Sequence, residues 1–348
     1  MTATLLHEPA EAVRSARRVR GSRVRRRLLA LALAVVALFF VDVLLGSYTV
    51  TIPDFFRILA GEQIPGASFI VMESKLPRAV VGLLVGLAFG ASGAILQTML
   101  RNPLASPDII GVTAGASAFA VFAIVVVGVS GQAVSWFALG GACAVALTIH
   151  LVARRNGVSG HRLILVGIGV AAMLQATTSY LLTRSDLRTA SEVLVWLNGS
   201  LNNSTWDRVT NLLVALAVLL PLLVYLSRGL TGLELGNDTA AGLGVPVEGT
   251  RLGLLMTSVA LSGVATAAAG PVAFIAFLSG PIARRLLRGA PSLTAAALVG
   301  ALIVLGAEFV AANLVTGATL PVGVVTGALG APFLLWLLVT TNRVGRGG

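Results

Sequence analysis

Lysine and cysteine are almost missing from this chain. Its 348 residues include a single cysteine, Cys143, and a single lysine, Lys75. One cysteine excludes an intrachain disulfide and a cysteine-rich metal site. A P-loop needs a Gly-Lys pair followed by Ser or Thr, because the lysine must reach the phosphates of a nucleotide. Since Ser74 precedes Lys75 and Leu76 follows it, the chain cannot hydrolyse ATP by that route. Any ATP-driven role requires a separate ATPase.

Charge is also scarce, and long apolar runs take its place. Charged residues make up 11% and hydrophobic residues 56% of the chain, and the mean hydropathy is +0.93. A soluble domain carries about twice that charged fraction. A helix of roughly 20 residues crosses a hydrocarbon core. The runs therefore predict an all-α integral membrane protein with ten spans, at about 28–47, 78–99, 109–129, 132–152, 163–183, 209–228, 252–269, 271–287, 292–316 and 322–341.

Positive charge is divided unevenly between the two sides that these spans define. With the N-terminus inside, 19 of the 25 Arg and Lys residues fall in inner segments and 6 in outer ones. The positive-inside rule then places both termini in the cytoplasm. The same bias explains the net charge of +11 without a nucleic-acid partner. We expect residues 1–27 to form a mobile basic tail near anionic lipid and residues 28–348 to form one transmembrane domain.

Ionisable groups inside the spans are rare. Asp42 and Glu308 lie within apolar runs, and carboxylates in such places mark proton or sodium routes in secondary transporters. The three histidines have no spacing suited to a metal ion, and no nucleophile–base motif is present. We therefore predict no enzyme site, no metal and no cofactor in this chain. The scarcity of carboxylates counts against ion-coupled transport, which is the alternative from a different functional class.

Glycine, in contrast, is abundant, with 39 positions. Gly82, Gly86 and Gly90 recur at every fourth residue, as do Gly323 and Gly327. Small residues at this spacing let helix backbones approach closely, so we predict that these glycines pack helices. Proline inside a membrane helix leaves a carbonyl group unpaired and bends the helix. Three prolines fall within predicted spans: Pro221, Pro281 and Pro332.

Two segments between spans are too long to be simple turns. Residues 184–208 lie outside and predict a surface helix, because they hold two tryptophans suited to the membrane interface, Trp196 and Trp206. Residues 229–250 lie inside and are broken by glycines. Within them, residues 235–243 predict a short helix with Asn237 or Asp238 as its cap. A loop of this length has a function or is disordered, and its apolar and small residues argue against disorder.

A series of motifs, in order along the chain, resembles one transporter family. The motifs are Leu76 to Arg78, Gly90 to Ala94 with Gln97, Arg101 to Pro107, Gly111, Gly115-Ala116, Trp196 to Ser200 with Trp206, Leu235-Gly236, Ala240 to Val245, Gly270 to Arg285, Leu320 to Gly323 and Gly330 to Phe333. They closely resemble the permease subunits of ABC importers for iron-siderophores, haem and cobalamin, the FecCD/BtuC-like family. The resemblance covers nearly everything after the basic tail.

The resemblance implies a BtuC-like permease in the cell membrane, with ten helices and both termini cytoplasmic. It implies a second permease subunit, in a homodimer or a heterodimer, and a separate ABC ATPase subunit that binds the ATP. It also implies an extracytoplasmic binding protein that delivers a ferric siderophore. Siderophore is favoured over cobalamin and haem because siderophore systems are the most numerous members of the family.

The resemblance further implies roles for individual residues. The inner loop at about 229–250 would dock on the ATPase through Leu235, Gly236, Asp238, Ala241, Gly242 and Gly244. Arg57 is the closest match in position to the outer arginines that bind the binding protein. Residues from Gly167 to Tyr180 and the following helix would line the pathway. Helix packing or the pathway would involve Gly82, Gly86, Gly90, Gly93, Gln97, Arg101, Asn102, Pro103, Glu308, Pro321 and Gly323.

The chain departs from the family pattern at four positions. Glu308 replaces the usual Asp, Ala312 a common Arg, Thr319 a frequent Glu and Ile282 the His that follows Pro281. The missing arginine at position 312 would remove a second contact with the binding protein. A partner subunit in a heterodimer is one way to supply it.

Overall fold

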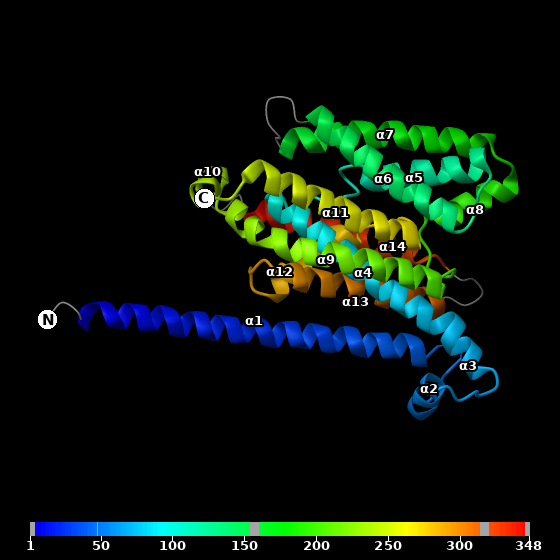
Figure 1. The fold of residues 1–348 in the computed structure, drawn as a ribbon, viewed down its shortest axis with the longest axis horizontal. Helices are drawn as coiled ribbons and strands as arrows, with labels where there is room; N and C mark the ends of the chain where they lie inside the picture. Colours follow the sequence, from blue (N-terminus) through cyan, green and yellow to red (C-terminus); the bar gives the residue numbers. More distant parts are fainter. Residues whose placement is uncertain (1–3, 47, 154–159, 314–319, 345–348) are drawn as a thin grey trace.

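The computed structural model describes residues 4–46, 48–153, 160–313 and 320–344, and these ranges contain helices, turns and connecting segments without a strand. Figure 1 shows the helices running side by side along one direction. The elements are α1 (Thr4–Leu44), α2 (Ile52–Leu59), α3 (Ala67–Phe69), η1 (Ile70–Lys75), α4 (Leu76–Met99), α5 (Val112–Phe122), η2 (Ala123–Val127), α6 (Gln132–Ala153), α7 (Gly160–Arg184), α8 (Leu187–Leu197), α9 (Trp206–Glu234), α10 (Asn237–Gly242), α11 (Val247–Ala269), α12 (Ile275–Leu286), α13 (Leu293–Asn313) and α14 (Val322–Val344). The predicted all-α class is confirmed.

Each of the ten predicted spans corresponds to a helix. In the described ranges, seven helices are long and apolar enough to cross a membrane: Gly21–Leu44, Ala67–Met99, Gln132–Ala153, Arg162–Arg184, Trp206–Glu234, Val247–Ala269 and Leu293–Asn313. Two shorter apolar helices occupy Val112–Val127 and Val322–Trp336, and α12 corresponds to the remaining span. The protein is therefore a multi-pass membrane protein. The end of the predicted span 292–316 lies outside the described residues.

The first helix is longer than its apolar run. The 41 residues of α1 begin at Thr4 and extend over about 62 Å at 1.5 Å per residue. The predicted basic tail and the first span therefore belong to one continuous helix, without a break near residue 27. In Figure 1, α1 lies along one edge of the bundle and its first turns extend past the other helices. Its apolar part packs on α13 through Val35, Ala301 and Leu305.

Two of the predicted spans are shorter than expected. The 12 residues of α12 cover about 18 Å, and the 11 of α5 with the 5 of η2 cover about 24 Å; a bilayer core is about 30 Å thick. Helix α12 begins only at Ile275 because Gly270 and Phe274 have φ angles of +74° and +67°. The predicted span 271–287 therefore starts with extended backbone, and the span 109–129 starts with a turn.

The bundle has two ends, and short helices identify them. Figure 1 shows α10 at one end, called the α10 end here, and α2, α3 and α8 at the opposite end, called the α8 end. Helix α8 is the surface helix predicted within 184–208, since only Val193 of it is fully buried and Leu187 is 86% exposed. Trp206 lies against the bundle, where its Nε1 donates to the Met72 carbonyl at 2.8 Å.

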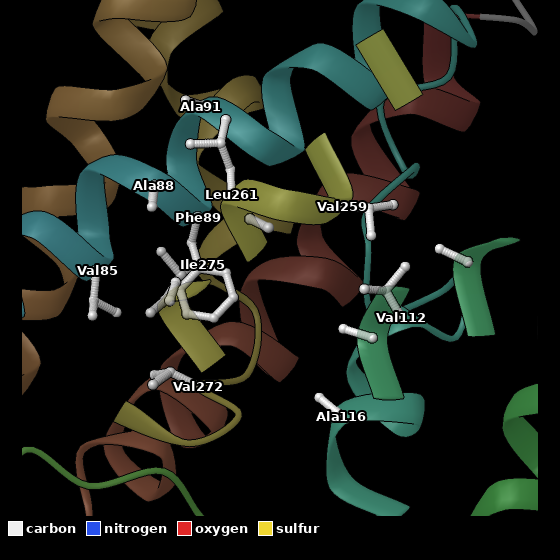
Figure 2. Packing of buried hydrophobic residues seen from close by; sticks show 14 of the residues in the cluster. Val85, Ala88, Phe89, Ala91, Val112, Ala116, Val259, Leu261, Val272 and Ile275 are labelled. Atoms are coloured by element: carbon white, nitrogen blue, oxygen red, sulfur yellow. The ribbon is translucent and has the colours of Figure 1, made fainter. Parts of the chain in front are cut away.

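The core is built around α4, most of whose residues are buried. Figure 2 shows Val85, Ala88 and Phe89 of α4 close to α11 and to the start of α12. On the opposite side, α4 lies against α13 with almost no side chains between them: a Cβ atom at Gly86 would lie 2.5 Å from the Cα of Ala301. Gly86 and Gly90, which the sequence analysis assigned to helix packing, both lie against the backbone of α13. Gly82 meets side chains instead, the nearest being Leu201.

Candidate functional site

A cavity of about 760 Å³ lies between α5, α7, α12 and α14. Its apolar lining includes Leu104, Leu182, Phe274, Phe277 and Leu334. Its polar lining consists of Ser106, Asp108, Thr113, Ser117, Gln175, Thr178 and Ser179. A large cavity with apolar walls and a few polar groups is the usual form of a small-molecule site. Gln175, Thr178 and Ser179 fall within the segment Gly167 to Tyr180 that the family resemblance placed on the pathway.

Two non-helical backbone segments, one before α5 and one before α12, reach this cavity within the bundle of spanning helices. The turn before α5 packs Gly111 against α7, where its Cβ would lie 3.0 Å from the Gly167 carbonyl. The segment before α12 contributes Pro271 and Ala273 to the lining. Backbone without helical hydrogen bonds is tolerated in a membrane only where it is buried in protein or lines a water-filled cavity. Both segments meet that condition, which favours an aqueous cavity.

The turn from Arg101 to Gly111 is held by its own side chains. Arg101 has a φ of +50°, and the Asn102 backbone N–H donates to the Gln97 carbonyl at 3.1 Å. The Asn102 carboxamide oxygen accepts from the Leu104 N–H at 2.9 Å. Further on, the Thr113 hydroxyl donates to the Asp108 carboxylate. The predicted structural role of Arg101 and Asn102 therefore lies in shaping this wall of the cavity, whereas no side-chain hydrogen bond is available to Pro103.

Helix α12 enters the cavity with two aromatic side chains. Phe274 and Phe277 contact each other edge to face, with ring centroids 6.3 Å apart. Phe274 has left-handed backbone and directly precedes the helix. Its ring lies against Gly330 of α14, where any Cβ atom would overlap it. The glycine in the predicted motif from Gly330 to Phe333 therefore makes room for an aromatic wall.

Gln97 of α4 completes a gap in α12. In an α-helix the N–H of residue 281 would bond to the carbonyl of residue 277, but Pro281 has no N–H. The Gln97 Nε2 donates to the Phe277 carbonyl at 3.0 Å and more weakly to the Ala276 carbonyl at 3.4 Å. Gly280 leaves the space for the amide, since a Cβ there would overlap the Gln97 Oε1. A side chain on one helix thus supplies the donor that proline removes from another.

Three predicted motifs meet at the α8 end of the cavity. Asn198-Gly199, Gly270-Pro271 and Gly323 lie backbone to backbone. The Gly323 N–H donates to the Gly199 carbonyl at 3.2 Å, and the Ser200 N–H to the Ala269 carbonyl at 2.7 Å. A Cβ atom at Gly323 would overlap the Asn198 carbonyl. Gly323 thus lies where two backbones meet, and Pro321, half-buried two residues earlier, leads the chain into this junction.

A group of charges crosses the helices at the same end. Arg78 of α4 and Glu308 of α13 form an ion pair at 3.2 Å, with 23% and 3% of the two side chains exposed. Arg78 also donates to the Asn202 side chain. Asp42 of α1 interacts electrostatically with Arg78 and Lys75. Glu308 therefore has a structural partner, which weakens its case as a proton or sodium carrier.

At the α10 end, the segment from Leu233 to Val245 presents small and apolar residues. Leu233 and Ala240 are buried, whereas Leu235 and Leu243 are 63% and 66% exposed. Asp238, Ala241, Gly242 and Gly244 are exposed as well. Arg101 Nη2 donates to the Leu233 carbonyl at 2.5 Å and fixes the segment on the bundle. The helix prediction is correct for α10, but its N-cap is Gly236 with φ +114° and no side-chain bond, because Asn237 and Asp238 lie inside the helix.

Arg57, the residue expected to contact a binding protein, lies in α2 at the α8 end. Its guanidinium is within 3.8 Å of Asp54 and 3.9 Å of Glu62, and 62% of the side chain is exposed. A partner's carboxylate would therefore have to exchange with two local carboxylates. The charge is accessible but not free.

Sequence reasoning placed the α7 part of the polar cavity lining on the pathway but missed the part from α5 and the turn before it. Ser106, Asp108, Thr113 and Ser117 each look ordinary in the sequence, because nothing local indicates which face of α5 meets α7. Phe274 and Phe277 entered the sequence analysis only as members of the motif from Gly270 to Arg285, without a role in a cavity. A usable signal was present: glycine and proline break the apolar runs at 101–111 and 270–274, which in a membrane protein points to a cavity.

Comparison with known proteins agrees with this architecture. Residues 33–340 match the FecCD transport family. The ferric enterobactin transport system permease protein FepG of Escherichia coli (strain K12) is 41% identical over 299 residues, or 86% of this chain and 91% of that protein. The achromobactin transport system permease protein CbrC of Dickeya dadantii (strain 3937) is 39% identical over 332 residues, or 94% of each. A solved structure of a metal-chelate type ABC transporter in an inward-facing conformation has a TM-score of 0.78 at 26% identity, covering 91% of this chain and 99% of that chain. With a family match over most of its length, this chain belongs to the FecCD transport family.

Proposed function

We propose that the chain is the membrane-spanning permease subunit of an ABC importer that moves a ferric siderophore into the cytoplasm. The main observation behind this proposal is that a cavity lies within the helix bundle. At the α10 end, the same bundle presents an exposed segment suited to a partner. The names of the two relatives, one for ferric enterobactin and one for achromobactin, support a siderophore over cobalamin or haem.

The energy source is a separate ATPase that binds the ATP. The chain has no P-loop, because its only lysine follows Ser74. The ATPase docks on Leu235, Gly236, Asp238, Ala241, Gly242 and Gly244, together with the exposed Leu243. Exposed leucines next to small residues form the kind of surface that partners bury. Arg101 connects this surface to the cavity wall through Leu233.

The α10 end faces the cytoplasm, and both termini lie on that side. Support comes from the arginines of the described loops and helix ends there, Arg101, Arg162, Arg228, Arg251, Arg284, Arg285 and Arg288, since cytoplasmic segments carry excess positive charge. The α8 end then faces outward and receives the substrate-loaded binding protein, with Arg57 among its contacts. Cys143 is the only cysteine, so a Cys143→Ser background allows single cysteines at either end to test this orientation with a membrane-impermeant maleimide.

A second permease subunit completes the pathway, in a homodimer or a heterodimer. Helix α7 lines the cavity through three polar residues, yet in its spanning window only 11% of the residues are buried. A helix with so little contact to its own chain is available to another subunit or to lipid. Ion-coupled transport by this chain alone has less support, because Glu308 is paired with Arg78.

Uptake of labelled ferric siderophore tests the proposal directly. Cells lacking this protein should lose uptake, and a plasmid copy should restore it only when the partner ATPase keeps its P-loop lysine. Labelled cobalamin and haem serve as competing substrates in the same cells. Uptake that continues with an inactive ATPase would contradict the ABC mechanism and favour the ion-coupled alternative. Uptake of cobalamin or haem alone would contradict the assigned substrate.

The coupling surface has its own test. No described atom lies within 4 Å of a Cβ placed on Gly242 or on Gly249, and both residues are exposed, so a side chain can point to solvent at both positions in the free subunit. Gly242→Leu should abolish uptake while membrane insertion remains normal, because the side chain obstructs the ATPase. Gly249→Leu, in the first turn of α11 and outside the proposed docking residues, is the matched control and should transport normally. Equal uptake by the two variants would contradict the docking assignment.

A further inference from the structure

Helix α12 is short and lies between two cavities. Its first turn reaches the main cavity with Phe274 and Phe277. Near Pro281, Gly280 and Arg284 line a second cavity of about 370 Å³ at the α10 end. With about 18 Å of helix, α12 by itself is shorter than the bilayer core is thick. The helix therefore borders free space near both of its ends.

The internal hydrogen bonding of α12 is incomplete at the same place. Pro281 removes one bond and leaves the Phe277 carbonyl to Gln97. Gln97 is fully buried, and among the described residues its Oε1 accepts no hydrogen bond. Buried amides usually use both halves. The Nε2 group of a half-satisfied amide, bonded to the Phe277 carbonyl and more weakly to the Ala276 carbonyl, is therefore the polar contact between the middle of α12 and α4.

The far end of α12 is connected to the proposed ATPase surface. Arg284 interacts electrostatically with Glu234, the residue immediately before Leu235. Arg27 of α1 donates to the Leu286 carbonyl at 2.8 Å, at the last turn of α12. Arg285 lies over the Trp336 ring of α14, 4.1 Å from its centroid. Glu234 and Arg284 line the same cavity, so a displacement of the segment after Glu234 would change the electrostatic interaction of Glu234 with α12.

We propose that α12 is the gate of the pathway: it pivots at Pro281, the hydrogen bond from Gln97 to Phe277 breaks, and the Phe277 side chain leaves the cavity. Gln97 is a positioning residue, since it binds the backbone of α12 and does not line the cavity. Movement at the α10 end reaches the gate through Glu234 and Arg284. The import direction in this inference rests on the proposed function. The movement of α12 is argued from the contacts in the structure.

Thiol labelling tests the gate without knowledge of the cargo. The complete transporter, with Cys143→Ser and Phe277→Cys, is reconstituted in nanodiscs and treated with a water-soluble maleimide. The labelling rate should differ at least about threefold between the nucleotide-free and the ATP–vanadate states. Adding Gln97→Leu should remove most of that difference, because α12 is no longer held in either state. Gln132→Leu, the same change at an exposed position on α6, should preserve it. Equal labelling in the two states of the Gln97-containing protein would overturn the proposal.

Restoring the missing bond tests the pivot. Pro281→Ala supplies an N–H to the Phe277 carbonyl within α12, so the gate should become rigid. In proteoliposomes we expect the thermal midpoint to stay or rise while ferric siderophore transport falls at least about fivefold. Pro221→Ala, also inside a spanning helix but outside the cavity walls, should transport at the wild-type rate. A Pro281→Ala protein that transports at the wild-type rate overturns the pivot. A wild-type transporter that changes its labelling with nucleotide but moves no siderophore contradicts the proposed cargo instead.

Discussion

Helix α4 contacts α13 and α12 in two different ways. Against α13 the contact is backbone to backbone, through Gly86, Gly90 and Gly300, with the ion pair between Arg78 and Glu308 at one end. Against α12 the contact also begins with a glycine, since Gly93 lies on the Ala276 carbonyl. It then changes to a single side-chain amide that fills a gap left by proline.

The difference separates a rigid interface from an adjustable one. At the backbone contacts of Gly86, Gly90 and Gly300 no side chain is available to change rotamer and make room, so the two helices have little freedom to move against each other there. A glutamine side chain has rotatable bonds, and the bond it makes is worth only about 1 kcal/mol net. The same helix thus provides a fixed frame on one side and a wall that is able to move on the other.

The largest effect should come from adding a methyl group to the rigid side. In Gly86→Ala the new Cβ would lie 2.5 Å from the Ala301 Cα and 2.6 Å from the Gly300 carbonyl. Backbone atoms cannot move aside as side chains do, so we expect destabilisation of about 3 kcal/mol and a lower thermal midpoint in detergent. Gly169→Ala, where no described atom lies within 4 Å, is the control. A Gly86→Ala midpoint equal to that of the control would refute the rigid interface.

Removal of the cation from the same interface should have a smaller effect. Arg78→Met leaves the Glu308 carboxylate buried without its ion-pair partner. Because Arg78 itself is 23% exposed, we expect about 2 kcal/mol of destabilisation rather than the full value for a buried pair. Adding Glu308→Gln should recover part of the loss in the same thermal assay. If the double variant is as unstable as Arg78→Met, the pairing does not explain the effect.

On the adjustable side, the corresponding methyl group should be tolerated better. In Gly280→Ala the Cβ meets the end of the Gln97 side chain, which is able to turn away at the loss of one hydrogen bond, about 1 kcal/mol. In a Gln97→Ala background the same substitution should be nearly neutral. A double-mutant cycle of thermal midpoints measures this coupling. Additive effects of the two changes would show that the amide and Gly280 do not meet.

The smallest effect concerns the exposed cap of α8, far from both contacts. Backbone hydrogen bonds from Thr189 and Arg188 hold the pKa of Asp186 below its usual range. A lowered pKa stabilises α8 above the ordinary carboxyl pKa of about 3.9, and this stabilisation is lost as the pH falls through the lowered value. The protection factor of the Thr189 amide in hydrogen exchange should therefore fall below about pH 4, and in Asp186→Asn it should lose this dependence. The contacts of α4 should not respond in this range.

Much of the helical architecture was predictable from composition and from the spacing of residues. The ten apolar runs match helices because hydropathy accumulates over a run, whatever its neighbours are. Gly86 and Gly90 were identified as packing residues because their spacing puts them on one face of a helix. The exposed segment around Gly242 followed from glycines and small residues in a long loop. In each case the information is local.

The remaining features depend on contacts between distant segments. Nothing near Gln97 indicates that its amide would serve Pro281, 184 residues later, because that pairing depends on how far α4 and α12 slide and rotate against each other. The late start of α12 depends on Phe274 accepting a left-handed φ against Gly330. Arg101 holds the Leu233 carbonyl, three residues before the Gly236 cap of α10, and this contact joins segments that are 132 residues apart in the sequence.

Composition and motif order by themselves determined that this protein crosses the membrane many times and belongs with transport permeases, because hydropathy and short motifs are properties of continuous sequence. The tertiary structure alone decided that one face of α4 is rigid and another adjustable, and that Ser106, Asp108, Thr113 and Ser117 line a cavity with α7. The physical reason is that helix depth and rotation are set by close packing over many side chains at once, so the partner of any one residue is a property of the whole bundle.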